Sequence, residues 1–151
     1  MIMVELGKIL IIGIVITTSN QDGRSLEDIP KLWEQFYAQS LPNLIPNKVN
    51  DKVYAVYTNY QGDFTAPYDL IIGCEVSSVD QVPVGMKAIT ILPERYQKFQ
   101  VGPGNPQEAL AQTWMDIWSS GLNRSYTADF ELYEYDEAQE LEVAVYVAVK
   151  E

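Results

Sequence analysis

The chain has 151 residues, a length that suits one compact domain with a core large enough to be stable without a disulfide. It contains no histidine and a single cysteine, Cys74, which excludes an intramolecular disulfide and any Ser-His or Cys-His nucleophile. A zinc or iron site is therefore not expected, and no cofactor is predicted. The formal net charge of −11 repels phosphate backbones and attracts cations, so direct nucleic-acid binding by this chain is disfavoured.

The most apolar segment lies near the N-terminus, where residues 9–16 read ILIIGIVI. This run is too short to span a bilayer, and it has neither a basic leader nor a small-residue cleavage pattern. Its β-branched content predicts a buried strand over about residues 8–17. We expect no membrane association and, by default, a cytoplasmic protein.

The first half of the chain continues with a helix and two strands. Residues 25–28 offer side chains for a helix N-cap, and apolar residues then recur at helical spacing. These are Ile29, Leu32, Trp33, Phe36 and Tyr37. Two β-branched and aromatic runs over residues 53–59 and 69–76 predict an antiparallel pair of strands.

The second half shows the same order of elements. A strand over residues 86–92 leads into residues 96–101, and a helix begins where Asn105 supplies an N-cap and Pro106 the first helical position. Two strands, over residues 129–135 and 141–149, end the chain. Corresponding elements start about 77 residues apart, although the two halves share few identical residues.

This periodicity predicts an internal duplication. We expect an α+β fold of two β-α-β-β units with pseudo-two-fold symmetry, antiparallel sheets, two main helices and a central ligand groove. A single domain should cover residues 1–151, with the first repeat over about 8–78 and the second over about 85–150. No DNA-binding segment is expected within it.

The acidic C-terminal strands provide the candidate binding residues. Seven acidic residues lie between Asp129 and Glu142, and most of them are typical of a solvated surface. Strand alternation places Glu131 and Tyr133 on one face, and a hairpin with the next strand could bring Tyr146 into the same chamber. A carboxylate buried among rings needs a positive partner, which a lipophilic cation would supply. The alternative is an ordinary edge-strand glutamate in water, beside half-buried tyrosines.

Other aromatic residues have two interpretations as well. Trp33 and Trp114 hold similar places on the two helices, so each is a core residue or a border of the groove. Tyr57 belongs to a second aromatic cluster, in which Phe64 and Tyr68 could act as a flap. No metal ligands and no catalytic residues are assigned.

The chain resembles one known family over about residues 8–150, and the resemblance rests on six segments and on the valine-rich strand that follows the last of them. The six segments read LWEQFYAQ, IPNKVNDKVYAVYTNYQGDF, YDLIIGCEVSS, PERYQKFQVGPG, QEALAQTWMDIW and SYTADFELYEYD, in that order. The sequence is similar to the gyrase-inhibitor-like small-molecule-binding domain, also called the bacterial transcription activator effector-binding domain. The resemblance is to stand-alone members such as those carried on integron gene cassettes.

This resemblance implies a duplicated fold with an aromatic groove and an acidic ligand-binding residue at Glu131. It also implies an aromatic ligand contact at Tyr146 and, less directly, contacts at Tyr133, Trp33, Tyr57, Phe64, Tyr68 and Trp114. The expected function is binding of lipophilic, drug-like organic cations, linked to transcription regulation or multidrug sensing. A separate DNA-binding protein or a homodimer is the expected partner. Two alternatives stay open: a hydrolase of reactive electrophilic natural products that uses a groove glutamate, and a gyrase-type protein-interaction partner.

Overall fold

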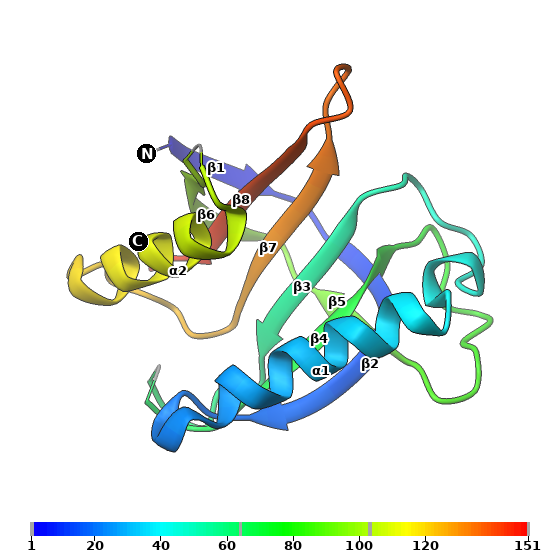
Figure 1. Ribbon diagram of the computed structural model, residues 1–151, viewed down its shortest axis with the longest axis horizontal. Helices are drawn as coiled ribbons and strands as arrows, with labels where there is room; N and C mark the ends of the chain where they lie inside the picture. The colour runs from blue at the N-terminus through cyan, green and yellow to red at the C-terminus, as the bar shows by residue number, and fades with distance from the viewer. Residues whose placement is uncertain (1, 64, 103, 151) are drawn as a thin grey trace.

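Eight antiparallel strands in a single sheet, with two main helices, form the framework of the computed structural model, which describes residues 2–63, 65–102 and 104–150 (Figure 1). The strands are β1 Ile2–Leu6, β2 Ile9–Thr18, β3 Val53–Thr58, β4 Tyr68–Glu75, β5 Lys87–Ile91, β6 Glu94–Gln100, β7 Ala128–Tyr135 and β8 Leu141–Ala148. The helices are α1 Arg24–Ala38 and α2 Pro106–Ser119. The α+β class, the antiparallel sheet and the two helices are as predicted.

The order of strands in the sheet is symmetric about its centre. It runs β1-β6-β8-β7-β3-β4-β2-β5, so β7 and β3 are neighbours and each is followed outward by its own hairpin partner. One side of the centre holds β3-β4-β2 of the first repeat and the other holds β7-β8-β6 of the second, while the two edge strands are exchanged: β5 follows β2, and β1, from the N-terminus, follows β6. The centre of the sheet is therefore the seam between the two halves.

Strand β1 was not predicted, and it completes this symmetry. It pairs antiparallel with β6, from Ile2 opposite Lys98 to Leu6 opposite Glu94. On the other edge β5 pairs with β2 in the same manner. The edge strand of the second half is thus supplied by the N-terminal residues, whose five-residue span carries too little periodicity to predict a strand alone.

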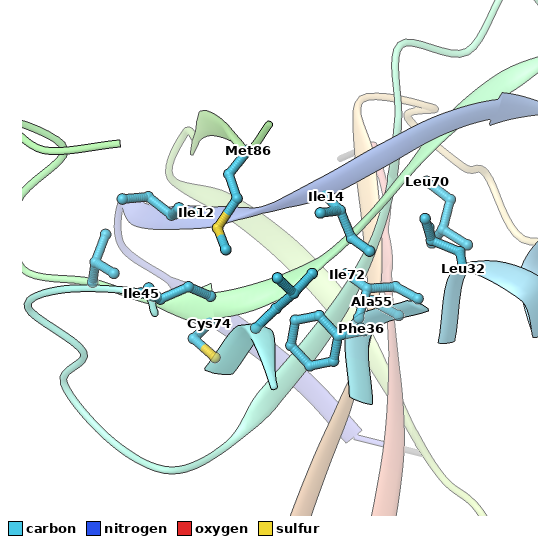
Figure 2. Close-up of a cluster of buried hydrophobic side chains, with 12 residues drawn as sticks. Ile12, Ile14, Leu32, Phe36, Ile45, Ala55, Leu70, Ile72, Cys74 and Met86 are labelled. Carbon is cyan, nitrogen blue, oxygen red and sulfur yellow. The ribbon is translucent and has the colours of Figure 1, made fainter. Parts of the chain in front are cut away.

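Helix α1 packs closely on the sheet. Leu32 and Phe36 are its buried residues and lie over β2 and β4, in the cluster drawn in Figure 2. The helix starts after Gly23, whose φ of 71° suits glycine, and no side chain caps it. The predicted cap in residues 25–28 is wrong, because Asp28 instead accepts a hydrogen bond from the Thr18 hydroxyl at 2.8 Å.

Helix α2 is held more loosely. It begins as predicted, with the Asn105 side chain accepting hydrogen bonds from the backbone N–H groups of Gln107 and Glu108 and with Pro106 at the first position. Ile117 is its only buried residue, and it packs on Val145 and Val147 of β8. No helix within the described residues is long and apolar enough to cross a membrane.

The two faces of the sheet carry different cores. The face that carries the helices holds two clusters of buried side chains. One includes Leu32 and Phe36 of α1, and the other includes Ile117 of α2 with Val145 and Val147 of β8. On the opposite face the curled sheet folds over a third cluster that includes Ile11, Tyr54, Tyr96 and Phe130. Figure 1 shows that the centre of the sheet, β3 and β7, lies between the two helices.

Candidate functional site

Glu131 lies at the centre of this symmetric sheet. It sits in the middle of β7, directly opposite Ala55 of β3 and Val145 of β8. Its exposed fraction is 2%. The side chain points to the face of the sheet that carries the helices, since it contacts Trp114 of α2.

Three aromatic side chains donate hydrogen bonds to the Glu131 carboxylate. The Tyr57 hydroxyl donates to Oε2 at 2.8 Å, the Trp114 Nε1–H donates to the same oxygen at 2.7 Å, and the Tyr133 hydroxyl donates to Oε1 at 2.5 Å. These donors come from β3, α2 and β7. We call Tyr57, Trp114 and Tyr133 the aromatic cage.

The duplication explains two of these donors. The pairing of β3 with β7 is centred on Ala55 and Glu131, and Tyr57 and Tyr133 each follow that central pair by two residues on their own strand. Each half therefore contributes one tyrosine to the same face. Only the second half contributes a carboxylate, since the first half has Ala55 at the corresponding position.

The environment of Glu131 is unusual for a buried acid because every donor is neutral. Within residues 2–63, 65–102 and 104–150 the ion pairs are Lys52–Glu134, Arg95–Glu5 and Arg124–Asp129, and none of them includes Glu131. A buried charge is normally paired with an opposite charge. The negative charge of Glu131 is thus solvated by dipoles but not neutralised.

This environment shifts several pKa values in a consistent way. Burial raises the pKa of Glu131, and the hydrogen bonds from Tyr133, Trp114 and Tyr57 offset part of that rise. Burial, and then the charge of Glu131, hold the pKa values of Tyr57 and Tyr133 far above their usual range. Both hydroxyls therefore remain protonated donors at neutral pH.

Further rings extend the cage on both sides. Trp33 of α1 meets Tyr133 edge to face at 4.9 Å, and Tyr57 contacts Trp114 at 5.3 Å and Tyr68 at 5.6 Å between ring centroids. The structure therefore gathers five of the seven predicted aromatic residues around Glu131. A cation placed here would face several ring systems at once.

The predicted position of Tyr146 is wrong. The register of the β7–β8 hairpin puts Tyr146 opposite Phe130, while Glu131 is opposite Val145. Tyr146 stacks on Phe130 with a centroid distance of 4.7 Å and belongs to the cluster on the far face of the sheet. A one-residue difference in register moves a side chain to the other face, and that register is not readable from the sequence.

The predicted flap is also corrected. Tyr68 is the first residue of β4, only 3% exposed, and its hydroxyl donates to Asn20 at 2.8 Å. It packs beside Tyr57 as part of a strand and is not a loop residue. Phe64, the other residue assigned to the flap, lies outside the described residues.

One buried charge cluster was missed by the sequence interpretation. Asp129, two residues before Glu131, is fully buried and accepts hydrogen bonds from Arg124 Nη2 at 2.6 Å, the Tyr60 hydroxyl at 2.6 Å and the backbone N–H of Ala148 at 2.8 Å. The Arg124 guanidinium lies 4.4 Å from the Tyr126 ring centroid. The only signal in the sequence was that Arg124 is the last basic residue before a long acidic segment.

Asp129 and Glu131 therefore have different roles although they share one strand face. Asp129 has a permanent cationic partner and fixes the start of β7, whereas Glu131 has none. No group of three or more Cys, Asp or Glu side chains in the described part of the chain is arranged to hold a metal ion.

Comparison with known proteins places the chain in a family. A family model described as integron-associated effector binding protein matches residues 3–149. The Bacillus subtilis (strain 168) protein named "Putative transcriptional regulator protein YobU" is 31% identical over 127 residues, which cover 81% of this chain and 79% of that protein.

Solved structures show the same fold. An integron cassette protein from the mobile metagenome of Vibrio cholerae is 28% identical, with a TM-score of 0.77 over 99% of this chain and 95% of that one. SAV2435, solved bound to tetraphenylphosphonium, has 16% sequence identity to this chain, and its structure superposes with a TM-score of 0.77 over 99% of this chain and 93% of that one. The chain belongs to the integron-associated effector binding protein family.

Proposed function

We propose that this protein is an effector-binding protein that holds a lipophilic organic cation against Glu131, linked to transcription regulation or multidrug sensing. The observation that carries the proposal is the buried carboxylate with three neutral aromatic donors and no cationic partner among the described residues. The cation supplies the charge that the fold omits.

The energetics favour a cation with a large apolar surface. Each ring that faces the cation contributes roughly 0.5–2 kcal/mol, depending on how far the pair is desolvated. Burial of apolar ligand surface adds about 25 cal/mol per Å² before the costs of association. Rings impose few directional demands, so such a site discriminates by charge sign more than by shape.

Access to the carboxylate requires at least one donor to move. Trp114 is the donor carried by α2, the helix with a single buried residue, whereas Tyr57 and Tyr133 are fixed in central strands. We infer that an entering cation takes the place of the Trp114 indole beside Oε2. The indole then becomes a wall of the site.

Two relatives support this proposal. The structure of SAV2435 contains tetraphenylphosphonium, a lipophilic cation, in the same fold. The Bacillus subtilis relative is named for transcriptional regulation. The partners of Glu131 are aromatic side chains and Asp129 is held by Arg124, so we propose binding without turnover.

Charge selectivity is the direct test of the proposed function. Methyltriphenylphosphonium and triphenylphosphine oxide have nearly the same shape, but only the first is a cation. We expect the cation to bind at least about 30-fold more tightly, because only it replaces the missing counter-charge. Isothermal titration calorimetry gives both affinities, and tryptophan fluorescence reports on Trp114. Equal affinity for the two compounds would refute the proposal.

Affinity should also depend on pH. Because burial raises the pKa of Glu131, the acid takes up a proton at a higher pH than an exposed glutamate does, and a neutral acid offers no charge to the ligand. The affinity for methyltriphenylphosphonium, whose own charge is fixed, should rise with pH and level off above the pKa of Glu131. A titration series at different pH values measures this, and Glu131→Gln should give a flat profile.

A further inference from the structure

The ring contacts of the aromatic cage continue outward to the surface of the molecule. Trp33, which meets Tyr133 edge to face at 4.9 Å, stacks on Tyr37 with a centroid distance of 5.9 Å and an interplanar angle of 14°. Tyr37 is 58% exposed. An unbroken series of rings therefore leads from the buried carboxylate to solvent along α1.

A second exposed ring reaches the same area from β7. Tyr135 shares the face of Glu131 and Tyr133 by strand alternation, is 68% exposed, and is paired with Leu141, which is 41% exposed. Burial raises the pKa of Tyr37 and the next contribution comes from Tyr135, as expected for hydroxyls that lie near each other. We call Tyr37, Tyr135 and Leu141 the outer patch.

Scattered exposed apolar residues are normal on a protein surface. The outer patch differs because it is continuous with the cage through Trp33 and Tyr133, and because it carries two tyrosines, which supply contact area at a low cost in conformational entropy. Four residues of strand separate Glu131 from Tyr135, which corresponds to about 13 Å along β7.

We propose that the outer patch is a second binding position, which holds a flat aromatic group tethered to the cation at Glu131. The preferred ligands are then elongated aromatic cations, with the positive centre inside the cage and an aryl arm against Tyr37 and Tyr135. This inference rests on the proposed function, since the cage must first hold the cation. The net charge of −11 is consistent with an arm that is neutral or positive and disfavours an anionic one.

The test compares two phosphonium ions with the same head. Methyltriphenylphosphonium occupies the cage alone, and a triphenylphosphonium with a flexible tether of about 13 Å ending in a naphthyl ring spans both positions. We expect the long compound to bind roughly five- to 150-fold more tightly to the wild type, the range that two favourable ring contacts give. Tyr37→Ala and Tyr135→Ala should each remove a two- to tenfold share of this advantage while the affinity for the short compound stays the same.

Matched variants separate ring contact from general disturbance. Tyr135→Phe keeps the ring and should keep the advantage, and Leu92→Ala, at a site 70% exposed, should change neither affinity. Because Tyr37 packs on Trp33, Tyr37→Ala could fail to fold. In that case, the affinities of the wild type and of Tyr135→Ala for the two compounds test whether the outer patch binds the aryl arm.

The outcomes are distinguishable. If the short compound binds but the naphthyl arm adds nothing, or if its advantage survives Tyr135→Ala, the outer patch is not a binding position and the proposed function stands. If sedimentation shows a dimer that Tyr135→Ala dissociates while the arm adds nothing, the patch is a contact between copies and the inference is overturned. If neither compound binds the wild type, the proposed function and this inference fail together.

Discussion

Replacement of Glu131 by glutamine should lower the affinity for methyltriphenylphosphonium by about 100-fold or more. The change removes one partner of a buried charge pair in the complex, a loss that typically costs about 3–5 kcal/mol. Glutamine keeps the shape, and its amide oxygen still accepts from Trp114 and Tyr57, while the Tyr133 hydroxyl can turn to accept from the amide nitrogen. Calorimetric titration of both proteins measures the difference.

The control for this variant is Glu142→Gln. Glu142 lies on β8, is exposed, and its replacement changes the net charge by the same amount. We expect a change of less than about twofold at moderate salt, because an exposed charge is screened. If both variants weaken binding equally, the effect is one of overall charge and Glu131 is not the specific partner. Affinity for neutral triphenylphosphine oxide should be unaffected by either change.

The same variant should make the free protein more stable at neutral pH. A carboxyl group whose pKa is raised on folding stabilises the protein below its unfolded pKa, and this contribution is lost as the pH rises through the folded pKa. Glu131 therefore destabilises the free protein at pH 7, and glutamine removes that penalty. The expected combination, higher stability with lower affinity, is that of a binding residue and not of a structural one.

Asp129→Asn should destabilise the fold by about 3–5 kcal/mol. The Asp129 side chain is 0% exposed and the Arg124 side chain 4% exposed, so removal of the carboxylate charge leaves a buried guanidinium without its counter-charge. The Nε and Nη1 atoms of Arg124 have no hydrogen-bond partner in the described structure, so the cluster has little other means to satisfy the cation. Urea unfolding followed by circular dichroism gives the free energy.

Lys52→Met is the matched control for the ion pair. Lys52 and Glu134 form an ion pair whose side chains are 40% and 36% exposed, and the loss should be below about 1 kcal/mol. The double variant Asp129→Asn, Arg124→Met should regain stability relative to Asp129→Asn, because it removes the orphaned charge as well. A small loss in Asp129→Asn would show that water reaches Arg124 and that the cluster is not a structural anchor.

The elements that could be predicted from the sequence are those with clear local signals. Helix α2 has a complete start signal at Asn105 and Pro106, and the apolar spacing of Leu32 and Phe36 identifies the packed face of α1. The repeat in element order identified the duplicated architecture. Strand alternation alone placed Glu131 and Tyr133 on one face, as the structure has them.

Features that depend on pairing between distant segments could not be predicted. Tyr146 was misplaced because strand register is set by the turn and by tertiary packing, and either choice of register satisfies the alternation of β8. Trp114 as a donor to Glu131 depends on how α2 lies over the sheet. In the sequence, Asp129 cannot be distinguished from the other acidic residues of its segment. Its burial depends on the ion pair with Arg124, which only the structure shows.

The pairing of Glu131 with Ala55 has a consequence for stoichiometry. A second carboxylate at position 55 would lie directly across the strands from the first, where two like charges could not both stay ionised. Divergence of the two halves at this position leaves one acidic centre in a chain built from two similar units. In the proposed function, each polypeptide then binds one monovalent cation. The fraction of protein that is bound should rise with ligand concentration as a simple hyperbola, with no cooperativity within the chain.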